Sequence, residues 1–417
     1  MKPGPDTGKS AISGADLTAL TFLLGAVMSL LPFAMDATLP GLPDMQASFS
    51  ATVSQVQFVV TAYMLGIALG QLIFGPLSDR YGRRPVMLVA LALYVVTAAA
   101  SALVQHLYLL VGLRLLHGFV GVCGSVLART VARDLLVNER AARLLARIML
   151  VFAVATLVGP LIGGMLVTLA GWRSVFWLLT VAGAVMWVIV YRKLPETAPP
   201  ERQPIVPGRI ARNFAHLLSH REFLAPTSIA LASQIGIYLF ITNSALVFMP
   251  VLGYTPSEYA LLVACVMMGH ITGVQIGNAC VLRHGMARML KLGAAMSFLG
   301  GAMLVALAWG SVASGAAFGV AMGIFMVGNG LIIPNSTAAA LSPFPSMAGA
   351  ASSLQSVLYQ IFGALAAILL AALSDGTMRP FCLGIGLAGM AVLACERVAL
   401  RALPTAGSDH ARAVAKP

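Results

Sequence analysis

Long apolar runs fill most of this chain and constrain its fold more than any other feature. Each run has the roughly 20 residues that a helix needs to cross a bilayer. Of the 417 residues, 59% are hydrophobic and only 10% are charged, whereas soluble domains carry about 25% charged residues. The sequence therefore predicts an all-α membrane protein with about twelve transmembrane helices. We expect these helices at residues 17–40, 54–77, 85–104, 107–131, 142–169, 173–192, 223–252, 258–282, 287–308, 312–341, 346–373 and 378–400.

The stretch between the sixth and seventh runs differs from the rest of the chain. It is rich in proline and in basic residues. We interpret it as a cytoplasmic linker between two six-helix halves, an arrangement that fits two parallel repeats with a binding site between them. The predicted parts are an N-terminal tail (1–16), a first bundle (17–192), a linker (193–222), a second bundle (223–400) and a C-terminal tail (401–417).

The basic residues are distributed unevenly about the predicted helices. The formal net charge is +12, from 26 Lys and Arg against 14 Asp and Glu. Nearly all of the Lys and Arg fall on one side of the membrane, and basic loops mark the cytoplasmic side. We therefore expect a multi-pass protein of the cell inner membrane with both termini in the cytoplasm. The same placement argues against nucleic acid as a partner.

A densely charged stretch separates the second and third runs. It reads Gly75-Pro76-Leu77-Ser78-Asp79-Arg80-Tyr81-Gly82-Arg83-Arg84. Because each charge at the bilayer centre costs about 2.5–3.5 kcal/mol or more, we expect a short loop at the cytoplasmic face. The pattern G-x-L-x-D-R-x-G-R-R resembles the loop between helices 2 and 3 of the major facilitator superfamily. The resemblance implies the major facilitator fold, with two six-helix bundles that move against each other.

Asp36 and Arg114 stand out among the charged residues because each lies well inside a predicted span. Asp36 lies in the first run, and an intramembrane carboxylate must face a cavity or a partner. Arg114, followed by Gly118, resembles the fourth-helix motif of the superfamily, in which the arginine is associated with proton coupling. We expect proton-coupling roles for Asp36 and Arg114. The alternatives are a solvated helix-end acid for Asp36 and a structural role between helices for Arg114.

The fifth run carries Gly159-Pro160-Leu161-Ile162-Gly163-Gly164. Proline bends a helix and glycines permit a close helix crossing. The pattern G-P-x-x-G-G resembles the antiporter motif of drug:proton exporters, which usually begins with a further glycine where this chain has Ala155. The glycines alone would indicate close packing, but together with the two other motifs they favour an exporter over an importer.

Two cytoplasmic segments resemble the Bcr/CflA subgroup of drug exporters. One is Arg133-Asp134 after the fourth run, and the other is residues 342–354 before the eleventh helix. The resemblance implies a latch that closes the cytoplasmic side. In this latch, Asp79 faces the N-terminus of the helix that begins near Ser346, and Asp134 pairs with an arginine of the charged stretch. The predicted latch residues are Gly75, Asp79, Arg80, Gly82, Arg83, Arg84 and Asp134.

Scattered polar residues inside the spans are candidates for lining a mostly apolar binding pocket. Taken singly, each fits an interhelical hydrogen bond better than a ligand contact, and only the set as a whole suits a pocket. His117 and His270 are further candidates for a titrating group, a question that the sequence leaves open. The candidate substrate-binding residues are Asp36, Tyr63, Gln234, Tyr238, Asn243, His270, Asn335, Gln355 and Tyr359.

No enzyme signature accompanies these motifs. The sequence contains no P-loop, and its five cysteines form no metal-type pair, so we expect neither a cofactor nor a metal site. The function that we expect is export of small amphipathic compounds resembling chloramphenicol or bicyclomycin, driven by a proton gradient, from a monomer. A metabolite uniporter or importer on the same fold stays open, as does a membrane receptor that transports nothing.

Overall fold

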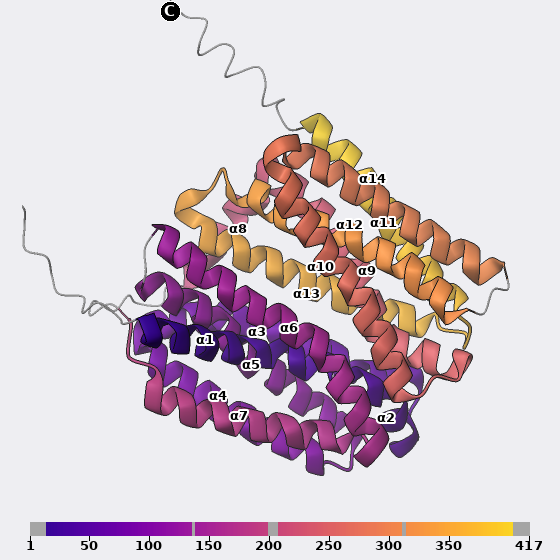
Figure 1. The fold of residues 1–417 in the computed structure, drawn as a ribbon, viewed down its shortest axis with the longest axis horizontal. Helices are drawn as coiled ribbons and strands as arrows, with labels where there is room; N and C mark the ends of the chain where they lie inside the picture. Colours follow the sequence, from indigo (N-terminus) through magenta and orange to yellow (C-terminus); the bar gives the residue numbers. More distant parts are fainter. Residues whose placement is uncertain (1–13, 136–137, 199–206, 311–313, 403–417) are drawn as a thin grey trace, which may run out of the picture.

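A computed structural model describes residues 14–135, 138–198, 207–310 and 314–402 of the chain. Within these residues, twelve helical spans are long and apolar enough to cross a membrane, as the sequence predicts. The helices pack as two bundles that lie side by side (Figure 1). The predicted fold class, an all-α membrane protein with two six-helix bundles, is therefore confirmed.

The first bundle occupies the lower part of Figure 1 in indigo to magenta. In it, α3 packs against α5, α4 against α7 and α1 against α6. Close approach between α3 and α5 depends on glycine, because a Cβ on Gly66 would lie 2.1 Å from the Leu115 carbonyl oxygen. Its helices are α1 (Gly14–Asp36), α3 (Val53–Tyr81), α4 (Arg83–Leu103), α5 (Leu107–Leu135), α6 (Asn138–Ala170) and α7 (Arg173–Lys193).

The second bundle occupies the upper part of the same view in red to yellow. Here α12 packs against α10 and α11, and α14 packs against α9 and α11. Its helices are α9 (Arg221–Leu252), α10 (Pro256–His284), α11 (Met286–Trp309), α12 (Gly315–Leu341), α13 (Ala348–Ala372) and α14 (Arg379–Ala402).

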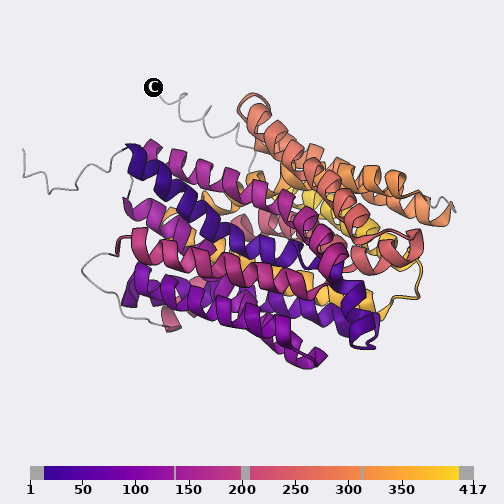
Figure 2. The ribbon, with the colours of Figure 1, turned by 60° about the horizontal axis from the view of Figure 1, so that its bottom comes forward.

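The two bundles meet along two helix pairs, α3 with α13 and α6 with α10. Figure 2 shows the bundles from another side, with the long helices running roughly parallel. We call the end of the molecule that carries Arg80, Arg83 and Arg84 the basic end, and the end that carries α2 (Leu42–Ser48) the opposite end. The basic end lies at the left of Figure 1 and the opposite end at the right.

The charged stretch after residue 75 is not the loop that the sequence suggested. Helix α3 continues through it to Tyr81, and only Gly82 separates α3 from α4. The charged residues lie beyond the apolar part of the helix, so the cost of burying a charge in lipid does not apply to them. The helix can therefore continue through them. The turn occurs at Gly82 because its φ of 104° is accessible mainly to glycine.

The first span is also less regular than predicted. Helix α1 ends at Asp36, and the chain continues through a short 3-10 helix (Leu39–Gly41) into α2. Proline explains the break: Pro40 has no N–H to donate to the Asp36 carbonyl, and its ring would clash with that carbonyl in a continuous helix. Asp36 therefore lies at a helix end within the span Thr18–Ser48, rather than in the middle of a helix.

The predicted linker contains a helix that the sequence reading missed. Helix α8 (Pro207–Leu218) packs against α13 and α9. Leu217 is fully buried there, in a small apolar cluster with Phe223 and Phe344. Helix α13 itself begins at Ala348, after a 3-10 turn (Pro345–Met347). Helix α8 is thus anchored to the second bundle.

Candidate functional site

Asp36 is a buried carboxylate at the end of α1, with 7% of its surface exposed. It takes part in no salt bridge within the described part of the chain. Its side chain lies against Gly159 of α6. It also lies within range of electrostatic interaction with Tyr63 of the first bundle and with Tyr238 and Tyr259 of the second. Asp36 is thus a buried acid near the boundary between the bundles.

Arg114 is fully buried in α5 and fastens three helices together. Its Nε donates to the Val59 carbonyl of α3 at 3.3 Å, and its Nη1 donates to the Ala34 carbonyl of α1 at 3.3 Å. The guanidinium also lies 4.1 Å from the centre of the Tyr63 ring. Backbone carbonyls and an aromatic face therefore solvate this charge, and the Ala34 contact holds it two residues from Asp36.

His117 is enclosed by tyrosines inside the first bundle. Its ring centre lies 4.2 Å from that of Tyr94 and 5.8 Å from that of Tyr63. Neither ring nitrogen has a hydrogen-bond partner in the described structure. The two tyrosine hydroxyls donate instead to the carbonyls of Leu30 and Leu31 in α1. His117 therefore lies in the bundle core, away from the interface between the bundles.

The glycines of the G-P-x-x-G-G motif make α6 the contact between α1 and the second bundle. A Cβ on Gly163 would lie 2.2 Å from the carbonyl oxygen of Ala37, the residue just after α1. A Cβ on Gly164 would lie 2.6 Å from both the Pro256 carbonyl oxygen and the Ala260 Cβ of α10. Pro160 lies between these glycines and Gly159, inside the same helix. Only residues without a side chain permit such close contact on both faces.

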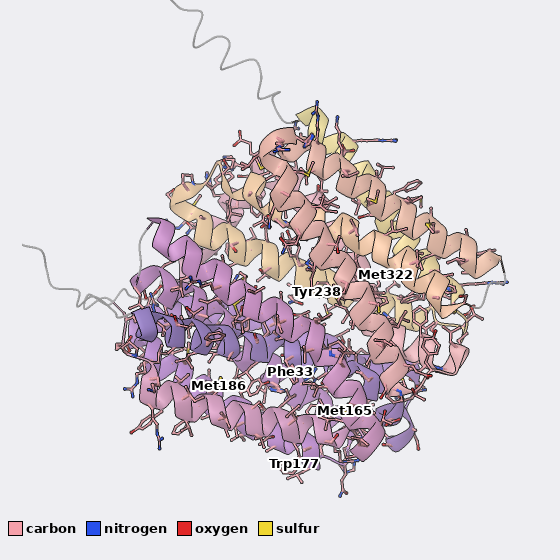
Figure 3. The ribbon with its side chains drawn as sticks, viewed as in Figure 1. Phe33, Met165, Trp177, Met186, Tyr238 and Met322 are labelled. Atoms are coloured by element: carbon pink, nitrogen blue, oxygen red, sulfur yellow. The ribbon has the colours of Figure 1, made fainter. Side chains whose placement is uncertain are left out.

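A hydrogen-bonded polar cluster lies in the second bundle. The Asn329 Nδ2 of α12 donates to the Ser233 hydroxyl at 2.8 Å and to the Gln234 Oε1 at 3.1 Å, both on α9. His270 of α10 lies beside Asn329. Tyr238 lies one helical turn beyond Gln234, and Figure 3 places its side chain near the boundary with the first bundle. The cluster brings together three of the predicted substrate-binding residues around Asn329.

The other predicted substrate-binding residues differ in their partners. Asn243 donates to the Leu239 carbonyl at 3.2 Å, and Asn335 donates to the Leu331 carbonyl at 2.7 Å, so both bond within their own helices. Gln355 of α13 donates to the Thr227 hydroxyl of α9 at 3.0 Å. Tyr359 is buried in α13. Gln355 thus makes the interhelical hydrogen bond that was the alternative to substrate binding, whereas Asn243 and Asn335 do not.

At the basic end, Arg83 joins the charged stretch to α5. Its Nη1 lies 2.5 Å from Asp79 Oδ1, and its Nε lies 3.1 Å from Asp134 Oδ2. Among the three arginines proposed to pair with Asp134, the structure thus selects Arg83. Asp79 accepts its hydrogen bond from Arg83, and the partner expected for it, the N-terminus of α13, lies across a cavity.

Glu196, just after α7, is part of this arrangement and was missed by the sequence reading. Its carboxylate accepts hydrogen bonds from the backbone N–H groups of Arg83 at 2.9 Å and Arg84 at 3.3 Å, as well as from Thr197 and Ala198. Partial burial alone would raise the pKa of Glu196, but these backbone N–H groups bring it below its usual 4.5. Glu196 therefore caps the start of α4, a role that only the folded chain reveals.

A cavity of about 370 Å³ opens between the bundles at the basic end. We call it the basic-end pocket. Helices α3 and α5 of the first bundle line it, and α8, the end of α12 and the first turns of α13 line it on the other side. Its polar and charged lining residues are Gln71, Asp79, Arg129, Thr130, Arg133, Asn213, Ser352, Ser353 and Ser356. None of the predicted substrate-binding residues is among them.

The bundles are in contact at the opposite end. The Ser54 hydroxyl of α3 donates to the Ala371 carbonyl of α13 at 3.0 Å. The Thr168 and Ser257 hydroxyls lie 3.0 Å apart and join α6 to α10. The buried polar groups therefore lie behind a closed opposite end, while a pocket opens at the basic end. No cluster of three or more metal-ligating side chains occurs among the described residues.

Comparison with known families identifies the fold. A model described as the Major Facilitator Superfamily matches residues 20–367. The chain belongs to the major facilitator superfamily. The resemblance noted in the sequence is thus confirmed, and the protein is a transporter rather than an enzyme.

Relatives of this superfamily member include drug-resistance proteins. It is 30% identical over 369 residues to a protein named bicyclomycin resistance protein homolog from Haemophilus influenzae, covering 87% of this chain and 91% of the relative. It is 26% identical to multidrug resistance protein D of Escherichia coli, covering 90% of this chain and 94% of the relative.

Solved structures of other superfamily members share the fold at low sequence identity. The xylose transporter XylE of Escherichia coli, in a partially occluded inward-open conformation, aligns with a TM-score of 0.74 at 14% identity, over 95% of this chain and all of that one. A transporter of the POT family aligns with a TM-score of 0.76 at 12% identity, over 95% of this chain and 97% of that one. These likenesses concern the fold alone.

Proposed function

We propose that this protein exports small amphipathic compounds across the inner membrane in exchange for protons. The observation that carries the proposal is the position of Asp36: a buried carboxylate without an ionic partner among the described residues, near the boundary between the bundles. Such a group can hold a proton when it is shielded and release it when water or a cationic cargo reaches it. The drug-resistance names of the relatives, one of which names bicyclomycin, support a drug-like cargo. Chloramphenicol is a second candidate, from the resemblance to the Bcr/CflA exporters.

The arrangement of the bundles supports an alternating-access cycle. We take the basic end as cytoplasmic, because Lys and Arg favour that side, and we place both termini there. In this state the protein opens toward the cytoplasm through the basic-end pocket and is closed at the opposite end. The two bundles, joined by residues 193–222, would rock about the α3–α13 and α6–α10 contacts. The functional unit would be a monomer without a bound cofactor.

Within this cycle the buried charges have separate tasks. Asp36 carries the proton, because it can lose its charge. Arg114 does not shuttle a proton, since arginine stays protonated in proteins. It holds Ala34 and Val59 together and so fixes the end of α1, on which Asp36 lies. Gly159, Gly163 and Gly164 let α6 support that end from the other side.

The cargo would be bound by polar groups of the second bundle that face the boundary. Gln234 and His270 lie close to Asn329, and Tyr238 lies within electrostatic range of Asp36. These groups offer both donors and acceptors in an otherwise apolar environment, which suits compounds with a few polar groups. Asp79, Arg83 and Asp134 would form the latch that holds the cytoplasmic side when it closes.

The decisive experiment compares the protein with Asp36→Asn in proteoliposomes. With a proton gradient imposed, the unchanged protein should move chloramphenicol against its concentration gradient, in the direction opposite to the proton flow. The asparagine variant should show no gradient-driven movement while keeping its elution profile and thermal stability, since the two side chains have nearly the same shape. Asp44→Asn, which removes one carboxylate at the opposite end, is the matched control and should behave like the unchanged protein.

Gradient-driven transport by the Asp36→Asn variant would contradict the coupling role. If the unchanged protein moved the compound only down its own gradient, with no response to pH, the protein would be a uniporter and the exchange mechanism would be wrong.

A further inference from the structure

The basic-end pocket holds two like charges that have no acidic partner. Arg129 and Arg133 are one helical turn apart on α5, and both line the pocket. The bonds of Arg129 go to the carbonyl and hydroxyl of Ser125 on its own helix. The two salt bridges among the described residues both use Arg83 instead. Like charges at this spacing repel each other, so an anion between them would be stabilising.

The opposite wall of this pocket is the start of a long helix. Ala348, Gly349 and Ala350 of α13 line the pocket. The first N–H groups of a helix have no acceptor within it, and the helix dipole adds partial positive charge at this end. No side chain caps α13, and its first turn contains no acid. Together with the two arginines, this wall makes the pocket electropositive from both bundles.

One carboxylate faces the same cavity. Asp79 lines it, and its Oδ1 lies 2.5 Å from Arg83 Nη1. Because Arg83 is not part of the lining, it offsets the charge of Asp79 from outside and leaves the arginines of the pocket free. The charged side chains of the lining are therefore two arginines and one carboxylate that is already paired.

We propose that the basic-end pocket binds a small anion of the phosphate class, a phosphate ester or a diphosphate, between Arg129 and Arg133 and the first turn of α13. Arginine pairs match the several oxygens of a phosphate group by bidentate hydrogen bonds. Ser352 and Ser353 add hydroxyl donors beside the helix start. The pocket volume of about 370 Å³ admits such a ligand without displacing α8.

Bound there, the anion bridges the two bundles. It contacts α5 of the first bundle and α13 of the second, and it occupies the space that must disappear when this end closes. The ligand therefore holds the basic end open. This consequence rests on the proposed alternating-access cycle, whereas the binding itself does not.

The test is calorimetric titration of pyrophosphate into the purified full-length protein. The double variant Arg129→Gln/Arg133→Gln should bind at least about tenfold more weakly, because it loses two charged hydrogen-bond donors. The control Arg283→Gln/Arg288→Gln removes the same charge from exposed positions near the turn between α10 and α11. It should retain the unchanged protein's affinity within about twofold, because neither Arg283 nor Arg288 lines the pocket.

A second readout follows the pocket itself. In a protein whose Cys265, Cys280 and Cys395 are replaced by serine, a cysteine at Ser353 should react more slowly with a thiol reagent when pyrophosphate is present. A cysteine at Ala47, exposed at the opposite end, should react at the same rate with and without it. This measurement does not depend on proton coupling, so it stays informative if the exporter proposal fails.

The source of the phosphate group is decided by repeating the titration in nanodiscs. If phosphatidylglycerol weakens pyrophosphate binding relative to phosphatidylcholine, a lipid headgroup occupies the pocket; if it does not, the ligand is a free anion. Either result supports a phosphate site. The proposal is wrong if pyrophosphate shows no saturable binding, if the Arg129/Arg133 variant binds it as well as the unchanged protein, or if the control loses as much affinity.

Discussion

The side chain of Asp36 lies directly against Gly159, so that a methyl group on residue 159 would come within 3.3 Å of the Asp36 Cβ. The contact joins the buried acid of α1 to the first glycine of the G-P-x-x-G-G motif in α6. It gives that motif a physical role: its glycines leave room for the end of α1 and for the carboxylate that it carries.

Substitutions in this motif should therefore separate function from stability. Gly159→Ala should lower proton-driven transport with little loss of stability, because the neighbouring Asp36 must shift by only a few tenths of an ångström. Gly163→Ala should destabilise the protein by about 1–3 kcal/mol, since its Cβ would meet the Ala37 carbonyl at 2.2 Å. Thermal unfolding in detergent and transport in proteoliposomes measure the two effects.

The matched control is Gly112→Ala in α5, where no atom lies within 4 Å of the added Cβ. Alanine also favours helix formation over glycine by about 1 kcal/mol, so this variant should be at least as stable as the unchanged protein. Equal behaviour of the Gly112 and Gly163 variants would contradict the packing role of the motif.

Arg114→Lys keeps the charge of the residue but not its two hydrogen bonds. A lysine cannot reach the Val59 and Ala34 carbonyls with the same fixed fork. We expect a loss of about 1–3 kcal/mol, the scale for leaving buried polar groups without partners. Thermal unfolding of Arg114→Lys beside that of the exposed Arg288→Lys provides the measurement. Unchanged stability would indicate that Arg114 acts through its charge alone.

Glu196 should make stability depend on pH at the acidic end. Its pKa in the folded protein lies below its usual 4.5, so its contribution is present above that value and is lost as the pH falls through the folded pKa. Because the side chain is exposed, we expect a contribution below about 1 kcal/mol. Glu196→Gln should remove this part of the pH dependence as the pH falls below 4.5.

Melting temperatures of the two proteins across that pH range provide the measurement. Glu222→Gln, at the start of α9, is the control because that exposed side chain accepts no hydrogen bond from the α4 start. Identical pH profiles for Glu196→Gln and the unchanged protein would exclude the capping role.

Asp79→Asn should favour the state in which the basic-end pocket is open. In the proposed closed state the carboxylate would face the N-terminus of α13, a charge–dipole contact of about 1 kcal/mol. In the open state it is paired with Arg83, which also bonds to Asp134. A cysteine at Ser353 should then be labelled up to about fivefold faster, following the conversion of 1 kcal/mol into a population ratio.

Asp44→Asn, which removes a carboxylate at the opposite end, should leave the labelling rate unchanged. An Asp79→Asn protein labelled at the rate of the unchanged protein would rule out a role of Asp79 in closing the basic end.

Much of the architecture could be predicted because lipid imposes simple rules. An apolar run of sufficient length must be a helix, since every backbone group has to be satisfied within it. For the same reason, Asp36 and Arg114 were recognisable as special without any knowledge of their surroundings. The errors occurred where this rule stops applying: at Tyr81, where α3 extends beyond the apolar span, and in α8, which lies outside the spans.

The partners of the candidate residues could not be predicted. Arg114 bonds to carbonyls 55 and 80 residues away, and the order in which helices surround it depends on the fold. Asn329 and Asn335 are both asparagines, six positions apart on α12. One bonds within its own helix, and the other joins α12 to α9. Which side of a helix faces a neighbour decides this difference.

The sequence by itself determined the class of protein: the number of spans, the concentration of positive charge at one end and the family motifs all follow from residue type and spacing. Only the tertiary structure decided that Asp36 lies at a helix break against Gly159, that Glu196 caps α4 and that two arginines without an acidic partner line the same pocket as the start of α13. The physical reason is that burial in lipid depends on the local composition of the chain. A contact between side chains depends on which helices pack together, and that is a property of the whole fold.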